Sequence, residues 1–275
     1  MDTATSCISI RELFSTLGSS AAPLLLDVRA QPAFQADPRM LAGATWRDPA
    51  SVVEWRKYIP VHRDIVVYCV QGHEVSKNTC AALREIGLHA HYLEGGAEAW
   101  KSTGLPTFEK QAQLQIPAGI NAPSKWVTRE RPKIDRIACP WLIRRFIEPT
   151  AEFIYVPAKD VLSVAATQNA IAYDVPDTQF THRVDKCSFD ALLVDFNLND
   201  PVLTQLAIIV RGADTGKPSL TPPSAGLLAI SLGLSELYRN DHDMLAHGMV
   251  MYDALYAWLK TAHAEIHNAD LFKKL

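Results

Sequence analysis

The sequence predicts an α/β domain with a mainly parallel sheet, followed by a mainly α-helical domain with a small β element. Two observations lead to this prediction. Short apolar runs alternate with a helical pattern over residues 1–106, and helical spacing dominates residues 126–275. Short apolar runs are typical of buried parallel strands, and their alternation with helices indicates βα units. The length of 275 residues also fits two domains.

The first domain shows its strands as three apolar runs. These runs cover residues 23–28, 64–69 and 89–93. Between the last two, apolar residues recur at helical spacing over residues 76–88, and Gly87 is expected to stop that helix. Alternation of this kind predicts a parallel sheet.

Residues 107–125 interrupt the pattern and are predicted to be a linker, because they are polar at first and then rich in Pro and Gly. The remaining chain, residues 126–275, is predicted to contain two strands, each followed by Pro, and five helices. Gly212 is expected to stop the third helix. The predicted strands are 153–156 and 170–175, and the predicted helices are 136–146, 188–196, 201–211, 225–238 and 241–260.

The composition excludes several classes of protein. A net charge of −3 argues against a nucleic-acid-binding domain. No apolar run reaches the roughly 20 residues that a membrane helix needs, and the N-terminal residues do not resemble a signal peptide. Five scattered cysteines without a CxxC pair indicate neither a disulfide framework nor a thiolate zinc site. We therefore expect a cytoplasmic protein with reduced thiols.

The segment Tyr68–Ser76 is the most informative part of the chain. A strand ends at Cys69, a short loop with Gly72 follows, and a helix begins near Val75. Backbone N–H groups of such a loop, together with the helix N-terminus, stabilise a thiolate or bind an anion. Because the thiolate is the nucleophilic form, the pattern favours covalent catalysis. The alternative is a buried cysteine at the end of a strand.

Three motifs in order resemble the rhodanese-type sulfurtransferase family over residues 8–106. They are Leu25-Leu26-Asp27-Val28-Arg29, then Leu41-Ala42-Gly43-Ala44, and finally Leu93-Glu94-Gly95-Gly96 followed by Trp100, Gly104 and Pro106. Cys69 falls where that family has its persulfide-forming cysteine. The resemblance implies a rhodanese-like fold. It also implies that Cys69 takes a sulfur atom from a donor and passes it to an acceptor, without a cofactor.

The resemblance implies that the loop residues Cys69, Gly72, His73 and Glu74 form the catalytic site, with Gln71 among the groups that bind the substrate. The loop has the six-residue length associated with sulfur chemistry. Its sixth residue is Glu74, where active rhodaneses carry Arg. A carboxylate facing the sulfur would repel a dianion and raise the thiol pKa, so thiosulfate is expected to be a poor donor. His73 could supply a compensating positive charge or a proton. Alternatively, Glu74 faces outward and caps the helix.

Residues 125–145 are basic, with a net charge of +5. Such a segment is usually a solvated face with salt bridges, but arginine forks also bind oxyanions. Including two arginines outside this segment, the sequence offers five candidate oxyanion ligands besides Gln71. They are Arg29, Arg136, Arg144, Arg145 and Arg183.

The second domain resembles the C-terminal domain of the ChrB chromate-resistance family over residues 126–262. The matching motifs are Trp126-Val127-Thr128-Arg129, Lys133-Ile134-Asp135-Arg136, Cys139 to Phe146, Thr181-His182-Arg183 with Asp185, Cys187 to Asp190, Arg211 to Asp214, Asp241-His242, His247-Gly248-Met249 and Tyr252-Asp253. The resemblance implies a link to chromate resistance. The rhodanese-like part stands where the family has its usual N-terminal region, so a role in DNA binding is not carried over.

Polar residues with metal-binding side chains recur in the second domain. His182, Asp185, Asp214, His242 and His247 could together hold a divalent metal. The alternative is a buried network in which each histidine is hydrogen-bonded. The spacing alone does not decide between them.

Three functions are compatible with the sequence. The first is a sulfurtransferase that forms a persulfide on Cys69 during chromate, oxyanion or thiol stress, with a small molecule or a protein as sulfur donor and acceptor. The second is a non-catalytic sensor of chromate, another oxyanion or redox state, and the third is a metal-binding protein. We expect neither a membrane nor a nucleic acid as partner.

Overall fold

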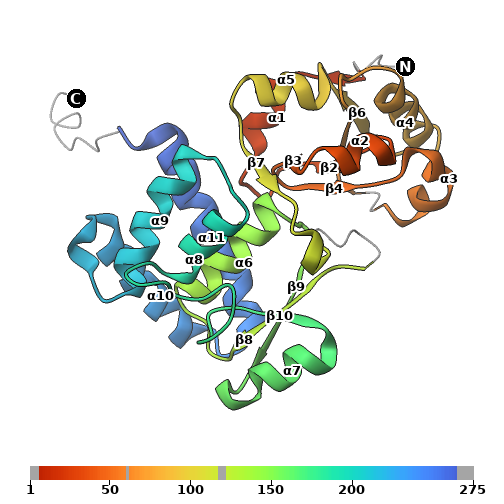
Figure 1. The fold of residues 1–275 in the computed structure, drawn as a ribbon. Coiled ribbons are helices and arrows are strands. Elements are labelled where there is room, and N and C mark those ends of the chain that lie inside the picture. The colour runs from red at the N-terminus through yellow and green to blue at the C-terminus, as the bar shows by residue number, and fades with distance from the viewer. Residues whose placement is uncertain (1–5, 60–61, 117–121, 265–275) are drawn as a thin grey trace, which may run out of the picture.

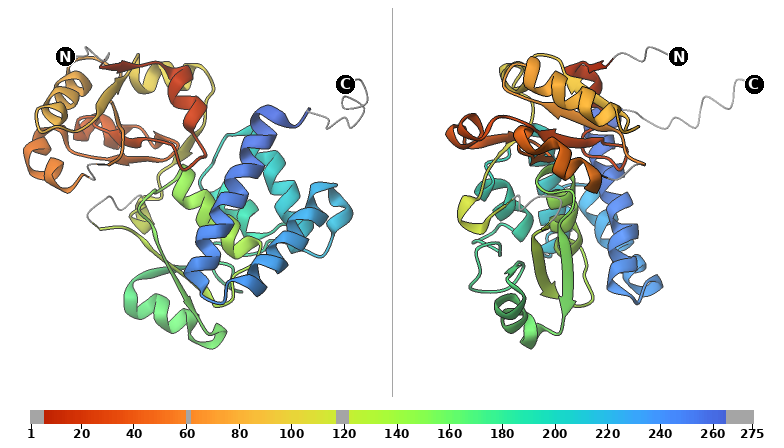
Figure 2. Two further views of the ribbon diagram at one scale, coloured as in Figure 1. Left: turned by 180° about the vertical axis from the view of Figure 1, so that it is seen from behind. Right: turned by 90° about the vertical axis from the view of Figure 1, so that its right-hand side faces the viewer.

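The computed structural model describes residues 6–59, 62–116 and 122–264. Two domains lie side by side, each with its own sheet (Figures 1 and 2). None of the helices in the described ranges has the length and apolar character that a membrane crossing requires. All five cysteines are free thiols.

A five-stranded parallel sheet forms the centre of the first domain, with the strand order β1, β6, β5, β2, β4. These strands are β1 (Cys7–Ile8), β2 (Leu24–Asp27), β4 (Ala44–Trp46), β5 (Ile65–Tyr68) and β6 (Ala90–Leu93). A separate antiparallel pair joins β3 (Arg39–Leu41) to β7 (Thr107–Glu109). The predicted α/β domain with a mainly parallel sheet is confirmed.

Alternating residues of β2 and β5 pack on opposite faces of this sheet, as the period of two along a strand requires. Leu24 and Ile65 belong to a core with residues of α3 and α4, whereas Leu25 and Val66 belong to a core with residues of α1 and α5. The helices of this domain are α1 (Ile10–Thr16), α2 (Gln31–Ala36), α3 (Val52–Trp55), α4 (Glu74–Arg84) and α5 (Gly96–Ser102).

The second domain is helix-rich with one small sheet, as predicted. Its parallel sheet has the order β10, β8, β9, formed by β8 (Lys125–Arg129), β9 (Glu152–Val156) and β10 (Ala170–Ala172). Its helices are α6 (Asp135–Phe146), α7 (Val161–Gln168), α8 (Ser188–Asp195), α9 (Pro201–Asp214), α10 (Pro223–Leu237) and α11 (Asp241–Ala257), which a π-helical turn extends (Trp258–Ala262). Neither α7 nor β8 was predicted from the sequence.

The predicted stop at Gly212 is wrong, because α9 continues to Asp214. A Cβ atom at Gly212 would lie 2.3 Å from the Ser224 side-chain oxygen. The glycine therefore allows close approach of α10 rather than ending the helix. The chain turns through Gly87, which has a φ of +81°. Helix α4 itself ends at Arg84, three residues before this predicted stop.

Residues 107–125 contain more regular structure than a linker requires. β7 pairs with β3 of the first domain, a 3₁₀ turn covers Ala112–Leu114, and β8 begins at Lys125. Pro117 and Gly119, which contributed to the prediction, lie outside the described residues.

One hydrophobic core runs through both domains. It joins Leu13 and Trp100 of the first domain to Trp141 and Tyr256 of the second. Hydrogen bonds reinforce this junction: the N–H of Gly43 donates to the Phe146 carbonyl at 2.7 Å, and the N–H of Glu109 donates to the Phe196 carbonyl at 2.7 Å. The two domains are therefore held together by packing as well as by the chain.

Candidate functional site

Cys69 lies directly after β5, in the loop that leads into α4 (Figure 1). Its side chain is buried, and its sulfur lies 3.2 Å from the hydroxyl oxygen of Ser76. That hydroxyl also lies 3.1 Å from the His73 carbonyl. Ser76 can therefore accept the S–H of the thiol or, once the proton has left, turn its O–H towards the thiolate.

The start of α5 holds this loop in place. The N–H of Ala97 donates to the Cys69 carbonyl at 2.9 Å, and the N–H of Glu98 donates to the Val70 carbonyl at 3.0 Å. With these carbonyls held by α5, the N–H groups of Gln71, His73 and Ser76 hydrogen-bond the sulfur. The loop is therefore an anion cradle of the kind that strand-loop-helix turns form.

The cradle changes the acidity of Cys69. Burial by itself raises the pKa of the thiol, but hydrogen bonds from Ser76, His73 and Gln71 outweigh burial and hold the pKa below its usual value. Cys80 lies in the same domain, and burial raises its thiol pKa instead. The surroundings of these two buried thiols therefore shift their pKa values in opposite directions.

The other predicted loop residues differ in how far they are exposed. Gly72 is buried, and a Cβ atom there would lie 2.6 Å from the Leu93 carbonyl. His73 and Glu74 are exposed at the start of α4. Gln71 is also exposed and donates its side-chain amide to Glu98 at 3.1 Å. Glu74 thus faces solvent at the start of α4, directly after the loop.

Arg29 has its guanidinium engaged inside the first domain. It donates to the Asp27 carboxylate from Nε at 2.9 Å and from Nη2 at 2.5 Å, and to Asp37 from Nη1 at 2.6 Å. The side chains of Arg29 and Asp27 are 2% and 0% exposed. This geometry connects β2 to the segment before β3 and leaves none of the three guanidinium nitrogens without an acceptor.

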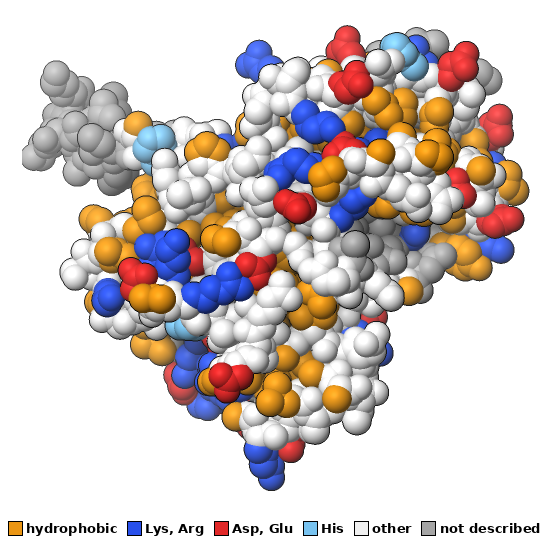
Figure 3. All heavy atoms as spheres, in the orientation of Figure 1, with side chains coloured by type: hydrophobic (Ala, Val, Ile, Leu, Met, Phe, Trp, Pro, Cys, Tyr) orange, Lys and Arg blue, Asp and Glu red, His pale blue; other side chains and the backbone are white. Residues whose placement is uncertain are grey.

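The four candidate oxyanion-binding arginines of the second domain each have a different partner. Arg145 forms a bidentate pair with Asp253, and Arg183 forms one with Asp195. Arg144 donates to the Ala151 carbonyl, and Arg136 donates to the carbonyls of Arg129 and Glu130. On the face in Figure 3, basic and acidic side chains are interspersed. These arginines stabilise local structure rather than converging on one patch.

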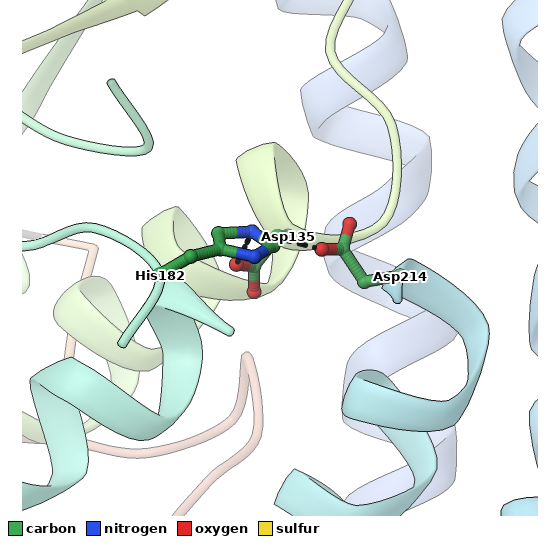
Figure 4. A group of neighbouring side chains, drawn as sticks. All are labelled: Asp135, His182 and Asp214. Atoms are coloured by element: carbon green, nitrogen blue, oxygen red, sulfur yellow. Dashed lines mark ion pairs between the residues drawn. The ribbon is translucent and has the colours of Figure 1, made fainter. Parts of the chain in front are cut away.

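A cluster of ionisable side chains lies in the second domain. His182 Nε2 lies 3.1 Å from Asp214, 3.4 Å from Asp174 and 3.6 Å from Asp135, each measured to a carboxylate oxygen. Figure 4 shows His182 and Asp214 pointing toward each other, with Asp135 beside the imidazole. The four residues come from the start of α6, the segment after β10, the loop before α8 and the end of α9.

Two of the five predicted metal ligands, His182 and Asp214, are therefore brought together. The other three lie elsewhere: Asp185 is exposed, His242 packs edge-on against Tyr155, and His247 stacks on Tyr238 with ring centroids 3.8 Å apart. Asp135 and Asp174 were not predicted as ligands from the sequence. Their positions, at a helix start and just beyond a strand's carboxyl end, are signals that could have selected them.

The close approach of these ionisable groups changes their pKa values. Burial and the neighbouring Asp214 and Asp174 raise the pKa of Asp135 to about 8. Burial and Asp174 also raise the pKa of Asp214. The hydrogen bond to Asp174, together with the charges of Asp135 and Asp214, raises the pKa of His182 to about 9. The cluster therefore favours positive charge at its centre.

A groove of about 1060 Å³, lined by Lys110, Ser124, Lys125, Gln168 and Gln179 among others, lies elsewhere. It includes neither Cys69 nor the His182 cluster. Neither the Cys69 loop nor the His182 cluster thus opens into this groove.

Two families match this chain. Residues 11–103 match the family described as "Rhodanese-like domain", and residues 126–259 match "ChrB, C-terminal domain". The curated protein ChrB of Cupriavidus metallidurans is 35% identical over 133 residues, a match that covers 48% of this chain and 40% of that protein. The chain thus covers less than half of this relative's length.

Solved structures are similar to part of the chain. A rhodanese-related protein from Thermoplasma volcanium is 24% identical with a TM-score of 0.33, covering 37% of this chain and 95% of the other. A protein from Lactobacillus plantarum is 25% identical with a TM-score of 0.36, covering 38% and 89%. A rhodanese-like domain protein from Staphylococcus aureus is 21% identical with a TM-score of 0.31, covering 34% and 89%.

Proposed function

The chain joins a rhodanese-like domain to a ChrB C-terminal domain, and on this basis we propose that it is a sulfurtransferase that forms a persulfide on Cys69. The observation that carries the proposal is the hydrogen-bonded cradle that holds the thiol pKa of Cys69 below its usual value. The relationship to ChrB adds a context of chromate resistance. We place this activity in the cytoplasm, where reductants keep thiols free.

The reaction has two displacement steps. The Cys69 thiolate attacks the outer sulfur of a donor; a new S–S bond forms at Cys69, and the donor's own S–S bond breaks. The electron pair leaves with sulfite when thiosulfate is the donor, and with a thiolate when a persulfide is the donor. A nucleophilic acceptor then attacks the outer sulfur and releases the Cys69 thiolate.

The cradle has a role in both steps. N–H groups of Gln71, His73 and Ser76 donate to the sulfur of Cys69. The same donors stabilise negative charge when Cys69 leaves as a thiolate in the second step. Burial of Cys69 also limits the access of water and oxidants to the reactive sulfur.

Mass spectrometry of the intact protein tests the proposal. The reduced chain is incubated with thiosulfate and, separately, with cysteine persulfide, and its mass is compared with that of Cys69→Ser. We expect the gain of one sulfur atom in the original chain and none in Cys69→Ser, because that variant lacks the nucleophile. Cys80→Ser is the matched control, since Cys80 is a buried thiol of the same domain with a raised pKa, and it should gain sulfur normally.

The outcomes are distinguishable. Sulfur gained by Cys69→Ser would contradict the assignment of Cys69. No gain from either donor would contradict sulfur transfer altogether. In that case, preferential oxidation of Cys69 by chromate would support the sensor function.

Glu74 should control the choice of donor. Because Glu74 is exposed at the start of α4, where the Cys69 loop ends, Glu74→Arg replaces repulsion of thiosulfate by attraction. We expect the second-order rate constant for thiosulfate to rise by roughly 3- to 10-fold at low salt, and this gain to shrink as salt screens the charges. The rate is measured by stopped-flow mixing of reduced protein with thiosulfate.

Glu85→Arg provides the control for that change. It makes the same charge reversal at the exposed C-terminal end of α4. Eleven helical residues separate the two ends by about 16 Å, which exceeds the Debye length of about 10 Å at 0.1 M salt. An equal rate increase in both variants would show that net charge, and not the position of Glu74, sets the rate.

A further inference from the structure

The imidazole of His182 has more acceptors around it than it can serve. A neutral imidazole nitrogen carries at most one N–H, yet His182 Nε2 lies 3.1–3.6 Å from oxygens of three carboxylates. Asp135, His182 and Asp214 each offer one ligand atom, and these three atoms lie within 4.8 Å of one another. Such convergence requires a positive charge at the centre, either a proton on the imidazole or a cation.

The spacing fits a shared cation. Metal–ligand bonds to imidazole nitrogen and carboxylate oxygen are about 2.0–2.2 Å, so neighbouring ligand atoms around one ion lie about 3.0–3.5 Å apart. The distances from His182 Nε2 to Asp214 and Asp135 are 3.1 and 3.6 Å. When an ion displaces their protons, the two carboxylates and the neutral imidazole carry a net charge of about −2, which a divalent cation balances.

The ligands are held by a surrounding set of hydrogen bonds. Asp135 is 1% exposed, and its two oxygens accept the N–H groups of Ser188 at 2.5 Å and Phe189 at 3.1 Å, at the start of α8. The backbone of Asp135 in turn hydrogen-bonds Asp214. Second partners of this kind orient metal ligands and leave the other lone pair of each oxygen for the ion.

Asp174 completes the wall of the cluster. Its Oδ1 accepts the Ser188 hydroxyl at 2.9 Å, and its Oδ2 accepts Arg129 Nη2 at 2.8 Å. Asp174 forms ion pairs with Arg129 and Arg136, which partly balance its charge, and we therefore place it beside the ion rather than among its ligands. Asp135 and Asp214 have no such arginine among their described ion pairs.

We propose that Asp135, His182 and Asp214 bind one divalent transition-metal ion. Imidazole with carboxylates suits Mn²⁺, Fe²⁺ and Zn²⁺, whereas Mg²⁺ prefers oxygen ligands alone. The buried thiols of Cys139 and Cys187 do not belong to the group of convergent ligand atoms. His182 is 44% exposed, so the remaining coordination positions face solvent and are open to exchange.

Metal binding to the full-length chain tests the site. The protein is purified without a histidine tag, stripped with a chelator, and titrated with Mn²⁺, Zn²⁺ and Mg²⁺ by calorimetry, with elemental analysis of the reloaded protein. We expect one Mn²⁺ or Zn²⁺ per chain and much weaker binding of Mg²⁺. His182→Gln and Asp214→Asn should each weaken binding at least tenfold, because each removes a ligand.

Matched controls come from the same domain. Asp185→Asn and His247→Gln change the same residue types at exposed positions outside the cluster, and both should bind metal as the original chain does. Asp135→Asn is judged only with a circular dichroism spectrum, since Asp135 also holds the start of α8. His182 and Asp214 are less buried, so their variants keep the test valid if Asp135→Asn fails to fold.

Two results would overturn the proposal. One is a stripped chain that takes up neither Mn²⁺ nor Zn²⁺ at one ion per chain. The other is equal affinity in the original chain, His182→Gln and Asp214→Asn, which would place the bound ion elsewhere. In either case the positive charge of the cluster would be a protonated His182.

Discussion

Gly96→Ala is expected to slow the uptake of sulfur by Cys69 by roughly 100-fold, the size of effect that a displacement of about 1 Å has on a reacting group. Gly96 has a φ of +58°, and a Cβ atom there would lie 2.5 Å from both the Cys69 carbonyl oxygen and the Gly72 nitrogen. Both atoms belong to the backbone, so the loop itself must move. The hydrogen bonds that lower the Cys69 pKa depend on that loop.

Gly87→Ala separates this effect from ordinary strain. Gly87 has a φ of +81°, but a Cβ atom there meets nothing within 4 Å. Its alanine variant should lose about 1 kcal/mol of stability and take up sulfur at the normal rate. Rates are measured by quenched-flow mass spectrometry on protein shown to be folded. A normal rate in Gly96→Ala would mean that the junction of α5 with the loop does not position Cys69.

Arg29→Met is expected to lower the free energy of unfolding by about 3–5 kcal/mol. The substitution leaves the Asp27 carboxylate, which is 0% exposed, without the guanidinium that now donates to both of its oxygens. It also removes the donor to the Arg39 carbonyl at 3.0 Å. Urea denaturation monitored by tryptophan fluorescence measures the change.

Arg183→Met is the matched control for this prediction. Arg183 also makes a bidentate pair, with Asp195 at 2.6 Å, but its side chain is 41% exposed. Exposed ion pairs contribute about 0–1 kcal/mol, so this variant should unfold nearly as the original chain does. Similar losses in the two variants would show that burial does not set the contribution of Arg29.

Local patterns in the sequence were sufficient to predict both domains and the Cys69 loop. The runs that became β2 and β5 are short and apolar, and the strand, loop and helix around Cys69 follow one another without a break. Properties of this kind depend on neighbours in the chain. Such local features can therefore be predicted from the sequence alone.

Contacts between distant segments could not be predicted in the same way. Arg145 appeared available for an oxyanion, but its partner Asp253 lies 108 residues further along the chain. Asp135 gains its importance only when the loop before α8 and the end of α9 reach it. Gly212 appeared to be a helix stop because the approach of Ser224 is a tertiary contact. Tertiary packing decides these positions.

The core shared by the two domains has consequences for unfolding and for protein engineering. Trp100 and Trp141 belong to one apolar cluster, so each domain alone would expose apolar side chains that are now buried. Such a chain should melt cooperatively, and damage in one half is shared by the other. Grafting either half onto a different protein would require its contact face to be redesigned, because a large exposed apolar patch promotes association.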